Sequence, residues 1–354
     1  MTDLEKLCSR VTEAADCAVI TDDVNRRYFT AMKSSAGTLV VFPEKAYFII
    51  DFRYIEKAKK TVTACEVILQ DKLYEQINSL IEKHGAKTVS VNADTCTLSE
   101  LIAYQQKLNA EVIADTKLAE IIREIRTVKS QEQIDKIIKA QRIAERGFAH
   151  MLDFIKVGRT EKEIQLGLDY YMLKNGAEAL SFDTIALSGS NTSLPHGVPS
   201  DKKVESGEFV LMDFGATYDG WHSDMTRTVC VGKPSDKMKS VYETVLTAQL
   251  SALDAVKAGM SGKALDKIAR DIITEAGYGD NFGHSLGHGV GVEIHESPYA
   301  SPSREDILPE NSIVTVEPGI YLEGKFGVRI EDFVVVTENG CINMTKAPKE
   351  LICL

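Results

Sequence analysis

The sequence predicts two domains: an α/β domain, followed by an α+β domain whose two halves are related by pseudo-twofold symmetry. Three observations predict this fold. The 354 residues are enough for two or three domains of ordinary size. Strand and helix patterns alternate over the first 126 residues, which is typical of an α/β layer domain. A helix–helix–loop–hairpin pattern then occurs twice. We therefore expect an N-terminal domain at 1–126 and a C-terminal domain at 127–354.

The N-terminal domain combines helical periodicity with short apolar runs. We expect a tight turn at Pro43-Glu44-Lys45 between two of its strands. Nothing in this domain has the spacing of metal ligands or of a nucleophile, and we expect its single histidine, His84, to be an exposed residue at a helix end. The expected helices lie at Leu4–Ala14, Leu73–Lys83 and Ser99–Leu108, and the expected strands at Cys17–Ile20, Thr38–Phe42, Ala46–Asp51 and Thr88–Val91.

A charged segment, Glu120–Ser130, leads into a long helical pattern from about Gln131 to Ile155. Ser130 and Gln133 have the spacing of a capping box at the start of this helix. This helix opens the C-terminal domain.

A weak internal repeat organises the C-terminal domain. Gly158 suits the end of one helix, while Thr160 and Glu163 form a capping box for the next. The segment 258–265 repeats this pattern of a helix end followed by a helix start about a hundred residues later. Each copy continues through a loop that contains histidine into two apolar strand patterns: Phe209–Thr217 with His222–Val231, and Ile313–Leu322 with Val328–Val336. Two such halves would form a cleft where they meet.

Each strand pair carries two carboxylates where apolar residues are expected. Asp213 and Asp224 belong to the first pair, and Glu317 and Glu331 to the second. A hairpin brings the members of each pair face to face, and the symmetry would bring the pairs together. Four carboxylates in an apolar setting repel one another and take up protons unless a multivalent cation neutralises them. A charge on a strand edge explains any one of these residues, but not all four at matching positions.

The segment Phe282–Glu296 supplies a fifth ligand candidate. It holds His284, His288 and His295, three of the seven histidines of the chain, among four glycines that allow a close approach of the backbone to a ligand. Four carboxylates and one imidazole favour Mn²⁺, Fe²⁺, Co²⁺ or Zn²⁺ over copper or iron–sulfur chemistry. Shared carboxylates also suggest two metal ions, about 3.5–4 Å apart.

At these residues the chain resembles the pita-bread metallopeptidases, the family of aminopeptidase P, Xaa-Pro dipeptidase (prolidase) and methionine aminopeptidase. The N-terminal domain is similar to that of creatinase and of the proline-specific members. The resemblance implies that Asp213 binds one metal, that Asp224 and Glu331 bridge both, and that His288 and Glu317 bind the other. The matching stretches are Pro195-His196-Gly197, Asp213-Phe214-Gly215-Ala216 through Asp224, Gly287-His288-Gly289-Val290-Gly291, Val316-Glu317-Pro318-Gly319 and Arg329-Ile330-Glu331-Asp332.

The same resemblance places His196, His284, His295 and Arg329 around the metals or the substrate. His196 and His295 could donate hydrogen bonds to the scissile carbonyl oxygen, and Arg329 could orient ligand carboxylates. A packed loop residue is the alternative for His284, and a core tyrosine the alternative for Tyr321, which follows Glu317 by four residues. The remaining histidines, His150 and His222, are interpreted as structural.

The function implied is a manganese-dependent exopeptidase that hydrolyses the bond between an N-terminal residue and proline in short peptides. The hypothesis is that a hydroxide bridging two divalent ions attacks the carbonyl group, while Glu317 passes the proton to the proline nitrogen. Mn²⁺ is the expected ion, with Co²⁺, Zn²⁺ or Fe²⁺ as alternatives. A strict Xaa-Pro dipeptidase, a non-catalytic peptide-binding relative and a hydrolase of small creatine-like substrates are the other functions considered. Large dipeptidases of the family that the chain resembles carry an insertion between the positions of His295 and Glu317, with an arginine that holds the substrate carboxylate. Here this stretch is short and contains only Arg304, which favours an aminopeptidase.

Composition excludes other classes of function. The net charge of −11 divides into −2 for residues 1–126 (17 basic, 19 acidic) and −9 for residues 127–354 (24 basic, 33 acidic), so nucleic-acid binding is not expected. No apolar run reaches the roughly 18 residues of a membrane helix. The N-terminus shows no export signal, and the seven cysteines form no CxxC pair. We expect a cytoplasmic protein with reduced thiols, and the resemblance implies a homodimer.

Overall fold

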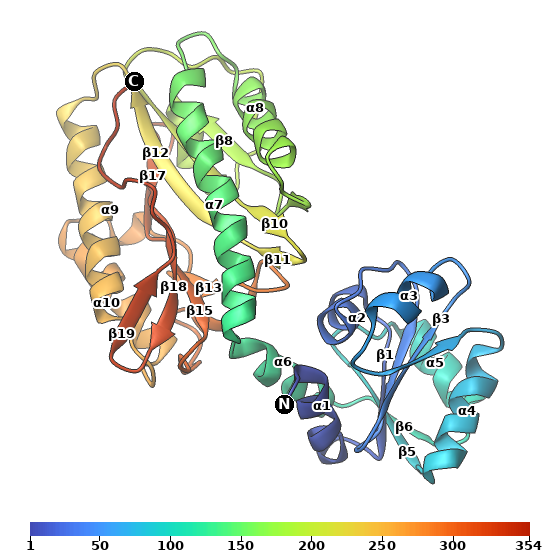
Figure 1. Ribbon diagram of the computed structural model, residues 1–354. Coiled ribbons are helices and arrows are strands. Elements are labelled where there is room, and N and C mark those ends of the chain that lie inside the picture. The colour runs from blue at the N-terminus through green and yellow to red at the C-terminus, as the bar shows by residue number, and fades with distance from the viewer. The chain divides into compact units, whose positions relative to one another are not determined.

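The computed structural model describes residues 1–354 and divides into two compact units, Met1–Arg126 and Thr127–Leu354 (Figure 1). Each unit has its own hydrophobic cores. None of the helices combines the length and the apolar character needed to span a bilayer.

The first unit is built on one six-stranded mixed sheet in the order β4-β3-β2-β1-β5-β6. The β1–β2 and β2–β3 pairs are antiparallel, and the other three pairs are parallel. The strands are β1 (Cys17–Ile20), β2 (Thr38–Val41), β3 (Ala46–Ile50), β4 (Glu66–Leu69), β5 (Thr88–Val91) and β6 (Glu111–Ile113). The helices are α1 (Asp3–Arg10), α2 (Asp23–Thr30), α3 (Ile55–Thr61), α4 (Leu73–His84), α5 (Leu98–Lys107) and α6 (Lys117–Thr127).

Side-chain alternation explains how this sheet is buried on both faces. Neighbouring residues of a strand point to opposite faces, so Ala18 packs on one core and Val19 on the other. The first core also contains residues of α1, α2, α3 and α6, and the second contains residues of α4 and α5. The predicted α/β layer domain is confirmed. His84 is the last residue of α4 and is exposed, as predicted, with its ring stacked on Phe42.

The charged segment expected before the long helix is partly helical. Helix α6 continues to Thr127 because Leu118, Ile121 and Ile125 recur on one side of it, where they are buried. The short elements α2, α3, β4 and β6 were not predicted from the sequence.

The second unit contains two helix pairs and a set of short antiparallel ladders. Its helices are α7 (Gln131–Phe154), α8 (Glu161–Lys174), α9 (Asp236–Ala255) and α10 (Gly262–Glu275). Its strands are β7 (Ala179–Leu180), β8 (Ile185–Ser188), β9 (Glu208–Phe214), β10 (Ala216–Tyr218), β11 (Trp221–His222), β12 (Met225–Val231), β13 (Gly287–Gly289), β14 (Glu296–Ala300), β15 (Ile313–Val316), β16 (Gly319–Leu322), β17 (Phe326–Arg329), β18 (Asp332–Thr337) and β19 (Gly340–Asn343).

The helix starts are where the sequence predicts them. Ser130 and Thr160 each accept a hydrogen bond from the third helical residue, and both capping boxes are complete. The Ser261 side chain also accepts a hydrogen bond from the third helical residue of α10, Ala264, which cannot complete a box. The second helix of each half therefore begins with a side-chain cap, as the predicted repeat requires.

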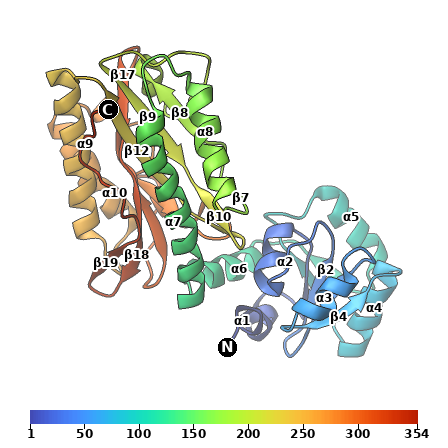
Figure 2. The same ribbon diagram turned by 45° about the horizontal axis from the view of Figure 1, so that its top comes forward.

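Each half packs one helix pair on its own strands (Figures 1 and 2). The core of the first half joins residues of α7 and α8 to apolar residues of β9 and β12. The core of the second half joins α9 and α10 to β15, β16, β17 and β18. This arrangement is the predicted α+β domain made of two related halves.

The predicted long strands are broken, and the prediction of four continuous strands in this unit is wrong. In the first half, β9 and β12 form one ladder, and β10 and β11 form another. In the second half, the β15–β18 ladder stops before the β16–β17 ladder begins. The breaks have local causes. A Cβ atom on Gly215 would lie 1.9 Å from the Ser223 oxygen, and Pro318 has no N–H group to continue a ladder.

Candidate metal centre

Three of the four out-of-place carboxylates lie in the ladder breaks, and the fourth lies next to one. Asp213 is the penultimate residue of β9, just before the break at Gly215, and Asp224 lies between β11 and β12. Glu317 lies between β15 and β16, and Glu331 between β17 and β18. Backbone groups at a break are released from their own ladder, so they can bond to the opposite half.

Bonds between the halves converge at Thr226. Its carbonyl oxygen accepts a hydrogen bond from the Glu331 amide at 3.2 Å, and its hydroxyl donates to Glu331 Oε2 at 2.8 Å. Two residues after Thr226, the Thr228 hydroxyl donates to the Arg329 carbonyl oxygen at 3.0 Å. The two acidic pairs are thereby fixed next to each other.

His288 joins these carboxylates from β13. Its Nε2 atom lies 3.3 Å from Glu317 Oε1 and 3.6 Å from Asp224 Oδ2. Its Nδ1–H group donates to the Gly289 carbonyl oxygen at 3.1 Å, which leaves Nε2 directed at the carboxylates. Gly287 makes this position possible, because a Cβ atom there would lie 1.9 Å from the Thr315 oxygen.

A cavity of about 470 Å³ is lined by all nine of the predicted site residues. One ligand atom each from Asp224, His288 and Glu331 lie within 4.8 Å of one another. The lining residues are Phe182, Asp183, Ile185, Pro195, His196, Asp213, Asp224, His284, Ser285, Gly287, His288, Ile294, His295, Tyr299, Glu317, Arg329 and Glu331.

The buried carboxylates hold protons more tightly than ordinary ones. Burial, together with repulsion from neighbouring carboxylates, raises the pKa values of Asp224 and Glu331 well above their usual range. Burial also raises the pKa of Asp213, although Arg329 acts against the shift. Glu317 behaves differently. Burial would raise its pKa too, but contact with His288 lowers it to about 2. The same contact raises the pKa of His288 to about 9, against the opposing effect of burial.

Two carboxylate oxygens of this cluster are buried without a hydrogen-bond donor. They are Asp213 Oδ1 and Glu331 Oε1. A buried acceptor without a donor is costly, and mutual repulsion adds to that cost. A divalent cation would satisfy both oxygens and take the place of the bound protons. The residues present therefore fit a cation-binding site.

Arg329 supports the cluster through a chain of hydrogen bonds. Its Nη2 group donates to Asp213 Oδ2 at 2.5 Å, and its Nη1 group donates to the Tyr321 hydroxyl at 2.7 Å. The Tyr321 oxygen lies 2.9 Å from His284 Nε2, while His284 Nδ1 lies 2.8 Å from the Ser285 oxygen. With Nδ1 donating to the Ser285 carbonyl oxygen, Nε2 is the acceptor of the Tyr321 hydroxyl hydrogen. Burial lowers the pKa of His284, consistent with a neutral ring.

Both ring nitrogens of His284 are thus engaged by the protein. The residue also lines the cavity, and its place around the metals or the substrate stays a prediction. Tyr321, for which a core position was the alternative, is buried, and its hydroxyl group is hydrogen-bonded to the site residues Arg329 and His284.

The other two predicted histidines are more exposed. His196 lies in the loop between β8 and β9, and His295 lies just before β14 with its ring 4.3 Å from that of His288. Both line the cavity, so a group held there can reach them. His222 and His150 do not line it; His222 contacts Thr217, and His150 stacks on Tyr171.

Several residues of the site carry no signal in the sequence. The Thr226 and Thr315 hydroxyls bind Glu331 and Glu317. Both lie inside apolar strands, where threonine is common, and only the alternation along the ladder could have directed attention to them. The apolar wall of the cavity is formed by Phe182, Ile185, Ile294 and Tyr299.

Fold and site together define a metal-dependent peptidase built from two related halves. The chain belongs to the metallopeptidase family M24, whose family model matches residues 135–338. A Creatinase/Prolidase N-terminal domain matches residues 4–128. The predicted resemblance to the pita-bread metallopeptidases is confirmed, and this family membership implies divalent metal.

Three similar proteins illustrate the relationship. An uncharacterized peptidase of Bacillus subtilis (strain 168) is 45% identical over 343 residues, which are 96% of each chain. The structure of an Xaa-Pro dipeptidase from Bacillus anthracis matches with a TM-score of 0.96 and 41% identity, and covers 99% of both chains. The structure of an X-Pro aminopeptidase from Thermotoga maritima MSB8 matches with a TM-score of 0.90 and 39% identity over 96% of this chain and 98% of that one.

Proposed function

We propose that this metallopeptidase hydrolyses the bond between an N-terminal residue and proline, with two divalent ions, most simply Mn²⁺, held by five residues. The ligands are Asp213, Asp224, His288, Glu317 and Glu331. The observation that carries the proposal is the pair of buried carboxylate oxygens without donors, on Asp213 and Glu331, in a cavity lined by all five. By family resemblance Asp224 and Glu331 would be shared between the two ions.

A divalent cation supplies Lewis-acid chemistry at this site, because it polarises a carbonyl group and makes water nucleophilic at neutral pH. The protein does the rest. His196 and His295 would donate hydrogen bonds to the carbonyl oxygen as negative charge develops on it. As water oxygen bonds to the carbonyl carbon, Glu317 would accept the proton and pass it to the proline nitrogen when the C–N bond breaks. Arg329 would hold Asp213 in place.

Charges around the cavity favour an aminopeptidase over a strict dipeptidase. A dipeptide ends in a carboxylate at the residue after the cleaved bond, and its recognition calls for a cation there. Arg304 does not line the cavity; its guanidinium stacks on Tyr299 at 4.1 Å and pairs with Asp306. Arg329 lines it, but its donors bind Thr226, Pro195, Tyr321 and Asp213. The similar solved structures carry both names, so their names do not decide between the two activities.

The experiment is an assay of peptides of increasing length with protein reconstituted with Mn²⁺ and of measured metal content. We expect hydrolysis of Leu-Pro-Ala and Leu-Pro-Ala-Ala at rates equal to or above that of Leu-Pro, and none of Leu-Ala-Ala. Cleavage of Leu-Pro alone would instead identify a strict dipeptidase. Loaded protein that cleaves no Xaa-Pro peptide would point to the non-catalytic, peptide-binding relative.

A further inference from the structure

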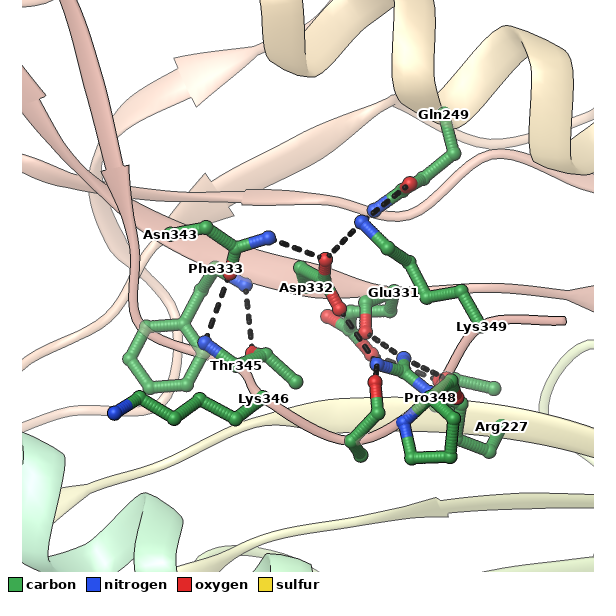
Figure 3. Close-up of polar contacts among 12 residues, drawn as sticks. Arg227, Gln249, Glu331, Asp332, Phe333, Asn343, Thr345, Lys346, Pro348 and Lys349 are labelled. Atoms are coloured by element: carbon green, nitrogen blue, oxygen red, sulfur yellow. Dashed lines mark hydrogen bonds and ion pairs between the residues drawn. The ribbon is translucent and has the colours of Figure 1, made fainter.

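A fully buried guanidinium lies behind the candidate metal centre, on the β12 strand. Arg227 is only 1% exposed, and each of its five N–H groups donates a hydrogen bond (Figure 3). The acceptors are the carbonyl oxygens of Pro348 at 2.8 Å, Thr226 at 2.9 Å, Glu331 at 2.5 Å and Ala347 at 2.8 Å, and Asp332 Oδ1 at 2.7 Å. None of these bonds reaches the cavity, so Arg227 has no place in the chemistry proposed above.

Two of the bonds tie the halves of the domain together at the metal ligands. The same Nη1 atom donates to the carbonyl oxygens of Thr226 in the first half and Glu331 in the second. Asp224 precedes Thr226 by two residues on the same chain segment. The distance between Asp224 and Glu331, the two proposed shared ligands, is thus set in part by one guanidinium group.

The other bonds connect this point to residues 343–349, which we call the C-terminal brace. Arg227 binds the Ala347 and Pro348 carbonyl oxygens. Asp332, which is fully buried, accepts from Lys349 Nζ at 2.8 Å and from Asn343 Nδ2 at 2.6 Å (Figure 3). The Tyr242 hydroxyl donates to the Lys349 carbonyl oxygen at 2.7 Å and anchors the brace to α9.

We propose that Arg227 is a positioning residue for the metal centre, and that the C-terminal brace is part of that centre although it supplies no ligand. The inference rests on the proposed metal site. Thr226 fixes one carboxylate oxygen of Glu331, and the other oxygen has no partner, so the position of the ligand depends on the backbone that Arg227 holds. Groups that orient the ligands of a metal ion contribute to its affinity, and their loss typically weakens binding by about 10- to 100-fold.

Lysine cannot replace arginine here. A lysine keeps the positive charge beside Asp332, but it has three donors on one atom and no planar fork. It cannot reach the Thr226, Glu331, Ala347 and Pro348 oxygens together. Arg227→Lys therefore removes most of the hydrogen bonds that Arg227 makes to the backbone while it keeps the positive charge at this position.

The experiment titrates metal-free protein with Co²⁺, followed by calorimetry and by the visible absorption of the bound ion, which reports the ligand geometry independently of activity. We expect Arg227→Lys to weaken Co²⁺ binding by about 10- to 100-fold and to alter the absorption bands. Lys349→Met removes one contact of Asp332 and leaves Arg227 in place. It should change the Co²⁺ affinity and the absorption bands in the same direction as Arg227→Lys, but by a smaller amount. Arg142→Met is the comparison variant: Arg142 donates to the brace at the Met344 oxygen but has no bond to Arg227, Asp332 or Glu331, so its effect should be smaller than that of Lys349→Met.

Wild-type Co²⁺ affinity and spectrum in a folded Arg227→Lys protein would overturn the inference. If Arg227→Lys does not fold, Lys349→Met decides, and an unchanged affinity and spectrum in that variant would overturn it as well. An equal loss in Arg142→Met would show a general effect of loosening the chain end and would count against a specific brace. Failure of the wild-type protein to bind Co²⁺ would instead contradict the proposed metal site itself.

Discussion

Glu317 is the residue on which the proposed chemistry depends most. It lies in the break between β15 and β16, where its carboxylate contacts His288 and accepts a hydrogen bond from Thr315 at 3.1 Å. As both a proposed ligand and the proposed proton carrier, it has two roles that a single substitution can separate. Glutamine keeps the size and one carbonyl oxygen of the side chain but cannot carry the proton.

Glu317→Gln should lower kcat by about 100- to 10,000-fold, the usual contribution of a general base, while metal remains bound. The measurement is kcat for an Xaa-Pro peptide, with metal content determined on the same sample. Glu323→Gln, an exposed glutamate in the neighbouring hairpin, serves as the control and should change neither quantity. A Glu317→Gln enzyme that binds metal and retains near wild-type kcat would remove Glu317 from the proton transfer.

At the scale of single residues, the sequence predicts the site residues that are unusual in their surroundings and misses those that are common there. A carboxylate inside an apolar strand, or three histidines among glycines, stands out from its surroundings, and all nine predicted residues line one cavity. Thr226 and Tyr321 are common strand residues. The contact of Thr226 with Glu331 arises only when the two halves are packed together, and the contact of Tyr321 with Arg329 depends on the pairing of β16 with β17.

The loop that carries His196 is held by a single buried acid at the start of α8. Glu161 is fully buried and accepts from the Ser188 amide at 2.7 Å, the Asn191 side chain at 3.0 Å and the Ser200 amide at 2.9 Å. Ser188 is the last residue of β8, directly before this loop, and Ser200 follows His196 by four residues. Glu161 therefore fixes the chain on both sides of His196.

Glu161→Gln should destabilise the loop, because the amide NH₂ group of glutamine would face donors that need an acceptor. We expect the free energy of unfolding to fall by about 1–3 kcal/mol, and hydrogen exchange to rise in residues 189–200. Glu163→Gln is the matched control in the same helical turn, since glutamine also completes a capping box. Equal effects of the two substitutions on residues 189–200 would contradict the role given to Glu161.

Helix starts are more predictable from sequence than strand ends. A capping box is a local pattern, and both boxes predicted in the second unit occur in the structure. The strand breaks depend on contacts across the hairpin, such as the approach of Ser223 to Gly215, while the apolar pattern continues through them. The carboxylates were identified from sequence, but the location of three of them in the breaks, and of Asp213 beside one, was not.

At the scale of the whole molecule, the acidity is concentrated where the site is. Of the net charge of −11, −9 belongs to residues 127–354, and the four carboxylates proposed as ligands are among the acidic residues that line one cavity. Burial and mutual repulsion raise the pKa values of Asp224 and Glu331, so the metal-free centre holds protons that a cation would displace. The first unit contributes no comparable cluster: the group of potential ligands lies in the second unit.

The number of divalent ions bound per chain tests this account most directly. Metal-free protein titrated with Mn²⁺ in a calorimeter, with elemental analysis of the loaded sample, should take up about two ions per chain. Asp224→Asn should lose both together, because Asp224 is proposed to bind both ions. A wild-type protein that binds no transition metal, or an Asp224→Asn protein that binds Mn²⁺ as tightly as the wild type, would contradict the proposal that this buried acidic cluster is a metallopeptidase centre.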